Sequence, residues 1–185
     1  MAQNKLNERQ QAILDFLQLK KSVSRQEIQN FVSEHFDKTS RATIRHIEDL
    51  HKLLTNDLDI TSGIRNHKVG IIGMKYRPLD NAKQIKEALE QLVALVNQTE
   101  NPIEKALICV LMISYIHPFE DGNKRTSRIL ANAVLLANDY CPLSYRNTNV
   151  DEYKKAILLF YEQNNTQYFK KLFIDQFKFA VDTYF

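Results

Sequence analysis

Two apolar segments on either side of a charged stretch most constrain how this chain folds. Residues 106–113 are apolar without interruption, and residues 129–137 are apolar except for Asn132. Helices that are apolar nearly all round belong in the middle of a domain. Between these segments stands HPFEDGNKRTSR, residues 117–128, with a histidine, two acids and three cations. Because charge is costly to bury, a charged loop joining two buried helices predicts a functional site.

The rest of the composition predicts long helices in one compact unit or in one domain with a small appendage. Only four glycines and four prolines in 185 residues favour few turns and long helices. The formal charge of +3 is too balanced to indicate a nucleic-acid partner by itself. Two lone cysteines, Cys109 in an apolar run and Cys141 in a loop, fit a reducing compartment. With no signal peptide and no run long enough to span a membrane, a cytoplasmic location is expected.

Apolar periodicity and capping residues set the expected helix boundaries. Asn81 or Asp80 caps one helix, Pro102 suits a first helical turn, and Asn123 is a good N-cap directly after the flexible Gly122. The expected helices cover residues 8–19, the segment after Ser24, 41–54 after a Ser40 cap, 82–97, 102–117, 124–137, 151–163 and 166–185.

The first three of these helices resemble a helix-turn-helix. Ser40, Arg41, Thr43 and Arg45 stand where a recognition helix would contact DNA. The alternative is a helical subdomain that packs on the core or on a partner. Residues 1–50 carry only one more basic than acidic residue, and a DNA-binding surface is usually more basic.

A β-prone segment with glycine punctuation, residues 60–73, predicts a small β-hairpin. It could be the wing of a winged helix or a flap beside the charged loop that aligns an extended stretch of a partner through strand pairing. The flap is the preferred interpretation.

Several side chains of the charged stretch suit a phosphorylated ligand. The backbone amides of Gly122 to Arg125 would point out of a helix N-terminus, which is an anion-binding arrangement. Lys124, Arg125 and Arg128 add positive charge to that end, where a structural helix would carry acids. A polyphosphate satisfies the amides, the helix dipole and two guanidinium groups together.

The two remaining titratable groups complete a reaction centre. Asp121 could pair with a neighbouring arginine, but it also suits Mg²⁺, which binds through carboxylate and substrate phosphate oxygens. His117 could complement a helix dipole or act as the base that deprotonates an incoming hydroxyl. Together these residues predict nucleotide phosphate transfer.

The same stretch resembles the signature of the Fic family, His-x-Phe-x-(Asp/Glu)-Gly-Asn-(Gly/Lys)-Arg-x-x-Arg. The match covers every fixed position, namely His117, Phe119, Asp121, Gly122, Asn123, Lys124, Arg125 and Arg128. The resemblance extends over about residues 45–185. It divides the chain into a helix-turn-helix-like segment, 1–45, and a Fic core, 46–185.

The resemblance implies an all-α core and a bacterial protein adenylyltransferase that moves AMP from Mg-ATP to a Tyr, Thr or Ser hydroxyl of a target protein. It implies that His117 is the catalytic base and that Asp121 holds the metal. Binding of ATP is implied for Gly122, Asn123, Lys124, Arg125 and Arg128. The implied substrate flap contains Gly63, Ile64, Arg65, Val69, Gly70 and Ile71.

Two other functions remain open at this stage. Lys124 also occurs at this position in Doc-like protein kinases, and a DNA-binding regulator could use the core only to sense nucleotide. Many Fic proteins are restrained by a helix with the pattern (Ser/Thr)-x-x-x-Glu-(Gly/Asn). Glu100-Asn101 fails that pattern because Val96 precedes it by four residues. Restraint is therefore expected from a separate inhibitory partner, from oligomer contacts or from the N-terminal helices.

Overall fold

The computed structural model describes residues 25–36, 41–56 and 58–184. Within these ranges the chain forms seven helices and no strand. The helices are α2 (Arg25–His35), α3 (Ile44–Thr55), α4 (Ala82–Gln98), α5 (Pro102–Ile116), α6 (Asn123–Ala137), α7 (Val150–Gln163) and α8 (Gln167–Tyr184). The all-α prediction is confirmed, while the helix expected over residues 8–19 and the Ser24 and Ser40 caps lie outside the described residues.

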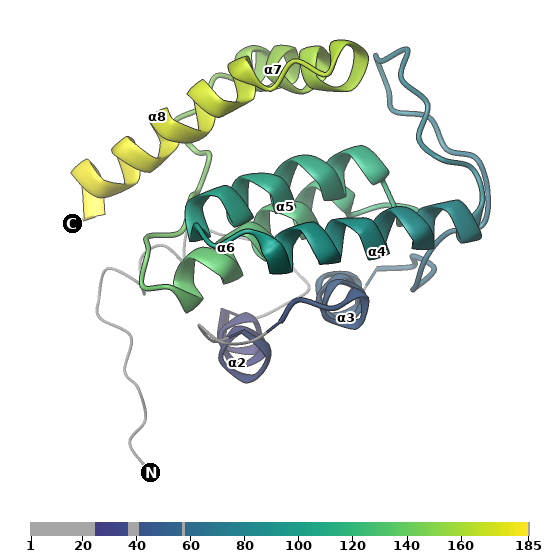
Figure 1. Ribbon diagram of the computed structural model, residues 1–185, viewed down its shortest axis with the longest axis horizontal. Helices are drawn as coiled ribbons and strands as arrows, with labels where there is room; N and C mark the ends of the chain where they lie inside the picture. The colour runs from purple at the N-terminus through teal and green to yellow at the C-terminus, as the bar shows by residue number, and fades with distance from the viewer. Residues whose placement is uncertain (1–24, 37–40, 57, 185) are drawn as a thin grey trace.

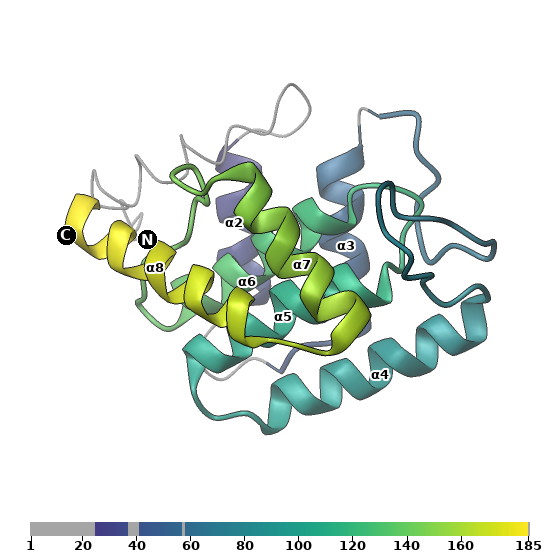
Figure 2. The same cartoon turned by 90° about the horizontal axis from the view of Figure 1, so that it is seen from above.

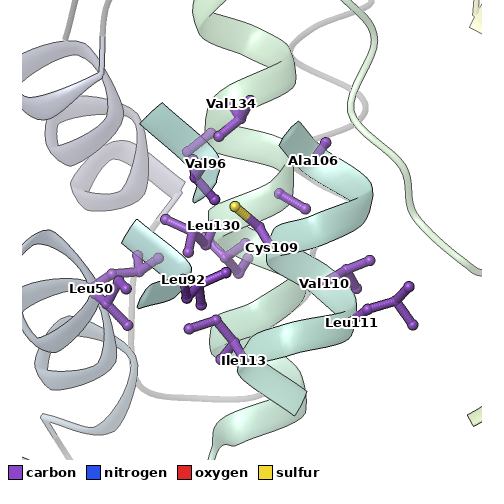
Figure 3. Packing of buried hydrophobic residues seen from close by; sticks show 14 of the residues in the cluster. Leu50, Leu92, Val96, Ala106, Cys109, Val110, Leu111, Ile113, Leu130 and Val134 are labelled. Atoms are coloured by element: carbon purple, nitrogen blue, oxygen red, sulfur yellow. The ribbon is translucent and has the colours of Figure 1, made fainter. Parts of the chain in front are cut away.

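The two apolar segments form the central helix pair, α5 and α6, which make the most extensive helix–helix contact in the described ranges. Pro102 occupies the first turn of α5, and Asn101 caps it by accepting a hydrogen bond from the Ile103 amide at 2.9 Å. Figure 3 shows Cys109 of α5 among apolar side chains that include Leu130 of α6. A buried bond between Ser114 Oγ and Ser127 Oγ, 2.9 Å long, joins the pair near the charged loop.

The other helices cover the central pair in layers, as Figure 1 shows. α2 and α3 lie on one side, α4 runs beside α5, and α7 and α8 lie on the opposite side (Figures 1 and 2). The buried aromatic residues Phe160, Phe169 and Phe173 place the apolar faces of α7 and α8 in the core. None of the helices in the described ranges has the length and apolar content that crossing a bilayer requires.

The start of α3 differs from the prediction. The helix begins at Ile44, and its N-cap is Thr43, whose side chain accepts a hydrogen bond from the His46 amide at 3.2 Å. Ala42 stays outside the helix because the Asn97 side chain binds both its N–H, at 2.8 Å, and its C=O, at 3.0 Å. Thr43 is therefore a capping residue, and Arg41 precedes the helix.

The β-hairpin prediction for residues 60–73 is wrong. Residues 58–81 connect α3 to α4 as a loop without strands, next to the end of α5 (Figure 2). Its contacts with the helical body come from individual groups. The Tyr76 hydroxyl donates to the Tyr115 carbonyl at 3.0 Å, and the Lys75 amide donates to Glu162 Oε1 at 2.8 Å. This loop is called the 58–81 loop below.

Candidate active site

The loop that joins α5 to α6 begins at His117, as the sequence predicts. His117 is the C-cap of α5, and its amide donates to the Ile113 carbonyl at 3.0 Å. Its backbone is left-handed, with φ 54° and ψ 55°, a conformation that few non-glycine residues adopt. The chain thereby turns sharply away from α5 while the imidazole stays at the helix end.

The Asn123 side chain fixes the loop through hydrogen bonds to the Phe119 backbone. Asn123 is the first residue of α6, and the N-cap is Gly122 with φ 78°, so the prediction that Asn123 caps the helix is wrong. Its buried side chain instead accepts from the Phe119 amide at 2.8 Å and donates to the Phe119 carbonyl at 2.8 Å. The amide side chain is therefore unavailable to a ligand, which leaves the Asn123 backbone N–H for that role.

His51 of α3 is a second support for the loop, and the sequence prediction missed it. It is fully buried, and its ring stacks on Phe119 with 3.7 Å between the ring centroids. Its Nε2–H donates to the Asp121 carbonyl at 3.0 Å. The place of His51 on the buried face of α3, next to Ile47, Leu50 and Leu54, was the available signal, because a buried polar group normally has a specific partner.

The surroundings of His117 favour a neutral imidazole. Burial lowers the pKa of His117 below its ordinary value of 6.5, and the charges of Arg65 and Lys124 lower it further. The bond to Ser114 O and the Asp121 charge act in the opposite direction. Nδ1 lies 3.4 Å from the Ser114 carbonyl, which can only accept, so this contact favours the tautomer with the proton on Nδ1. Nε2 then holds the lone pair that a general base needs.

The start of α6 concentrates positive charge, and its first turn contains no acid. The Gly122 amide donates to Asp121 Oδ1 at 2.6 Å and the Arg125 amide to Gly122 O at 3.0 Å. Of the four amides predicted to be open to an anion, those of Asn123 and Lys124 remain, because first-turn amides lack partners within the helix. Burial, followed by the charges of Arg128 and Lys154, lowers the pKa of Lys124.

Two partly buried tyrosines lie close to Arg128. Burial raises the pKa of Tyr145 and Tyr153, and the nearby guanidinium of Arg128 opposes that rise at both phenols. Tyr153 belongs to α7, and Tyr145 precedes it with a left-handed backbone, φ 55°. The prediction placed Arg128 at the site but did not identify these neighbours, which no local pattern connects to it.

One cleft of about 400 Å³ brings most of the predicted site residues together. Its lining consists of Gly70, Ile71, Ile72, His117, Glu120, Asp121, Gly122, Asn123, Lys124, Arg125 and Arg128. Of the predicted flap residues, Gly70 and Ile71 line the cleft, whereas Gly63, Ile64, Arg65 and Val69 do not. Ile72, which the prediction omitted, is fully exposed beside them.

A metal ion at this cleft would depend on a ligand for most of its coordination. No group of three or more His, Cys, Asp or Glu side chains gathers as a metal site anywhere in the described ranges. Asp121 is exposed in the cleft, and the Gly122 amide engages its Oδ1. One carboxylate fits Mg²⁺ bound together with phosphate oxygens and water, and does not fit a cage built by the protein alone.

The cleft therefore combines a neutral base, a helix N-terminus with three cations and one exposed carboxylate. Such a set can accept a proton from a hydroxyl while it holds a polyphosphate and the charge that develops during its cleavage.

The sequence of the chain is similar to those of known proteins. The sequence profile described as Fic/DOC family matches residues 41–135. The chain is 36% identical over 76 residues to a protein adenylyltransferase Fic of Nematostella vectensis. The matched region covers 41% of this chain and 18% of that protein. It is 32% identical over 104 residues to the protein of the same name from Drosophila melanogaster. That match covers 55% of this chain and 21% of the relative. The chain thus spans less than a quarter of the length of either relative.

Solved structures share the fold. The BepC protein of Bartonella tribocorum with bound AMPPNP superposes with a TM-score of 0.62 at 18% identity, over 92% of this chain and 86% of that one. An IbpAFic2 variant in complex with adenylylated Cdc42 gives a TM-score of 0.71 at 17% identity, over 95% and 62%. At these identities the likeness concerns the arrangement of the helices.

Proposed function

Because the chain belongs to the Fic/DOC family, we propose that it is a protein adenylyltransferase, which moves AMP from ATP to a Tyr, Thr or Ser hydroxyl of a target protein. The observation that carries this proposal is the single cleft that collects His117, Asp121, the start of α6 and Arg128. The names of the adenylyltransferase relatives support the same reaction.

His117 is the general base in this proposal. Its Nε2 accepts the proton of the target hydroxyl as that oxygen attacks the α-phosphorus of ATP. The new P–O bond forms while the bond between the α-phosphorus and the oxygen leading to the β-phosphate breaks, and pyrophosphate leaves. The lowered pKa of His117 supports this role, because only the neutral ring can accept a proton near pH 7.

The start of α6 binds the phosphates. The backbone amides of Asn123 and Lys124 donate to phosphate oxygens, and Gly122 lets the backbone approach them closely. Arg125 and Arg128 add guanidinium donors, for which phosphate oxygens are well-matched acceptors. Asp121 would hold Mg²⁺, which neutralises phosphate charge when bound.

The target protein binds along the 58–81 loop. Gly70 and Ile71 form the part of the cleft wall that this loop contributes, and Ile72 projects fully into solvent. An extended target segment beside Gly70 and Ile71 would place a hydroxyl within reach of His117. A protein substrate is supported by the IbpAFic2 structure, which contains adenylylated Cdc42.

Lys124 supports a second candidate, transfer of the γ-phosphate by a Doc-like kinase. The side chain is half-buried at the cleft, and burial lowers its pKa, with further lowering by the charges of Arg128 and Lys154. An ammonium in this position could reverse the orientation of ATP and expose its γ-phosphate. We favour AMP transfer because Arg128 supplies a second guanidinium for the terminal phosphates.

Labelled ATP separates the two reactions. The chain is incubated with Mg²⁺, a cell lysate and ATP labelled at either the α- or the γ-phosphate, beside a His117→Ala variant. AMP transfer predicts label that depends on His117 from the α position only, lower by about two to four orders of magnitude in the variant. Label from the γ position only would establish a kinase, and label from neither would refute both candidates.

A further inference from the structure

Arg65 is one of the most enclosed charged side chains in the described ranges, with an exposure of 5%. Its guanidinium donates three hydrogen bonds, all to backbone carbonyls. Nε donates to His117 O at 2.8 Å, Nη1 to His67 O at 2.6 Å, and Nη2 to Leu79 O at 2.6 Å. The Arg65 amide also donates to Pro118 O at 3.0 Å.

These bonds connect pieces of chain that are distant in sequence. His67 and Leu79 belong to the outgoing and returning halves of the 58–81 loop, and His117 lies 52 positions after Arg65. A guanidinium can donate in several fixed directions at once, whereas a lysine ammonium is a single point on a flexible stem. One side chain thus joins both halves of the loop to the turn that carries the base.

No acidic side chain of the described ranges forms an ion pair with Arg65. Asp80, an acid of the same loop, pairs with Lys68 instead, at 3.4 Å. The guanidinium is therefore committed to the backbone, and its charge lies beside His117. The other groups that act on His117 are Lys124 from α6, Asp121 from the connecting turn and the Ser114 carbonyl from α5.

We propose that Arg65 is a positioning residue that fixes His117 relative to the target-binding loop. This inference rests on the proposed function, because it concerns the alignment of the base with a hydroxyl bound along Gly70 and Ile71. The base and the loop share one anchor, so a target segment seated on the loop meets His117 at a set distance. Arg65 itself does not line the cleft, so it acts only through these two partners.

The first test separates positioning from nucleotide binding. Arg65→Lys keeps the charge and loses the fork, and Arg65→Gln loses both. Label transfer from α-labelled ATP at saturating ATP should fall about 10- to 100-fold in both variants, since small misplacements of a reacting group cost this much. Affinity for a non-hydrolysable ATP analogue with Mg²⁺, measured by calorimetry, should stay within about twofold. The control is Lys86→Gln, an exposed cation of α4 outside the cleft and the 58–81 loop, which should behave as wild type.

The second test needs no transfer activity. A protease that cleaves after lysine should cut at Lys68 and Lys75 faster in Arg65→Gln than in wild type or Lys86→Gln, because the loop has lost its anchor. The ¹³C-labelled ring resonance of His117, assigned with His117→Ala, should shift and broaden in Arg65→Lys but not in the control.

The outcomes are distinct. Wild-type transfer and cleavage rates in both Arg65 variants would overturn the inference. So would an equal loss of ATP affinity and transfer, or loss of the cooperative unfolding transition in Arg65→Lys, because either result describes a purely structural role. A wild-type chain that transfers no label refutes the proposed function, and cleavage and the His117 resonance then decide the anchoring alone.

Discussion

Two asparagines of α6 form a matched pair that separates the stability of the fold from the geometry of the site. Asn123 binds the N–H and C=O of Phe119, each at 2.8 Å. Asn132 binds the N–H and C=O of Leu143 at 2.8 and 3.0 Å. Both side chains are 2% exposed. The two sites have the same chemistry, but only the first touches the loop that carries His117.

Replacing either asparagine by alanine leaves one buried N–H and one buried C=O without partners. Each orphaned group costs about 1–3 kcal/mol, so each variant should lose roughly 2–6 kcal/mol of unfolding free energy. For a chain of this length, about 2–4 °C of melting temperature is lost per kcal/mol. We therefore expect both Asn123→Ala and Asn132→Ala to melt roughly 4–24 °C below wild type.

Transfer activity should distinguish the variants. At a temperature where urea titration shows both to be folded, Asn132→Ala should label protein from α-labelled ATP within about twofold of wild type. Asn123→Ala should lose at least about tenfold, because Phe119 and the turn on either side of it are no longer held. Equal transfer by the two folded variants would refute the argument that Asn123 shapes the active loop. A small melting shift in both would refute the hydrogen-bond magnitudes.

Four further predictions concern backbone strain, charge and pH. Gly122→Ala should lose about 1–2 kcal/mol in urea unfolding because of the left-handed backbone, and Gly73→Ala, with φ 80° and open space around it, should lose as much stability while keeping transfer. Since burial lowers the pKa of His117, the acid limb of the transfer rate should lie below pH 6.5; a limb above that value would contradict a depressed base. Burial lowers the pKa of His51 as well, so the unfolded chain binds more protons than the folded chain below pH 6.5, and the melting temperature should fall as the pH drops from 7 to 5. Arg128→Lys should weaken binding of an ATP analogue in calorimetry and change the melting temperature little, because a lysine keeps the charge but does not offer the paired donors of a guanidinium.

Local patterns were sufficient to predict the helical frame and the motif residues that line the cleft. Continuous apolar runs indicated the central pair, and Asn81 and Pro102 marked helix starts that the structure places at the expected residues. These predictions succeed because caps and periodicity depend on neighbours within a turn or two of helix. The motif residues share a cleft because they come from one turn between two packed helices.

Contacts across the sequence were not predictable in the same way. His51 and the Asp121 carbonyl are 70 positions apart, and neither residue type indicates the other. The hairpin failed for a related reason. Arg65 binds the carbonyl of His67 inside the predicted hairpin and those of His117 and Leu79 outside it, so tertiary contacts overrode a local β preference.

The residues that support the active loop find their partners within the protein, whereas the cations at the start of α6 find no acidic partner among the residues that the structure describes. His51, Asn123 and Arg65 hold the turn through stacking and hydrogen bonds to backbone groups, all of which the protein supplies itself. Lys124 and Arg125, by contrast, form no ion pair within the described part of the chain, at a helix end that is already positive. The loop is thus shaped before an anion arrives, while its electrostatic repulsion is relieved only afterwards. A polyphosphate therefore binds a loop that is already ordered. The free energy of binding is not reduced by the cost of ordering the loop, as expected of a preorganised site.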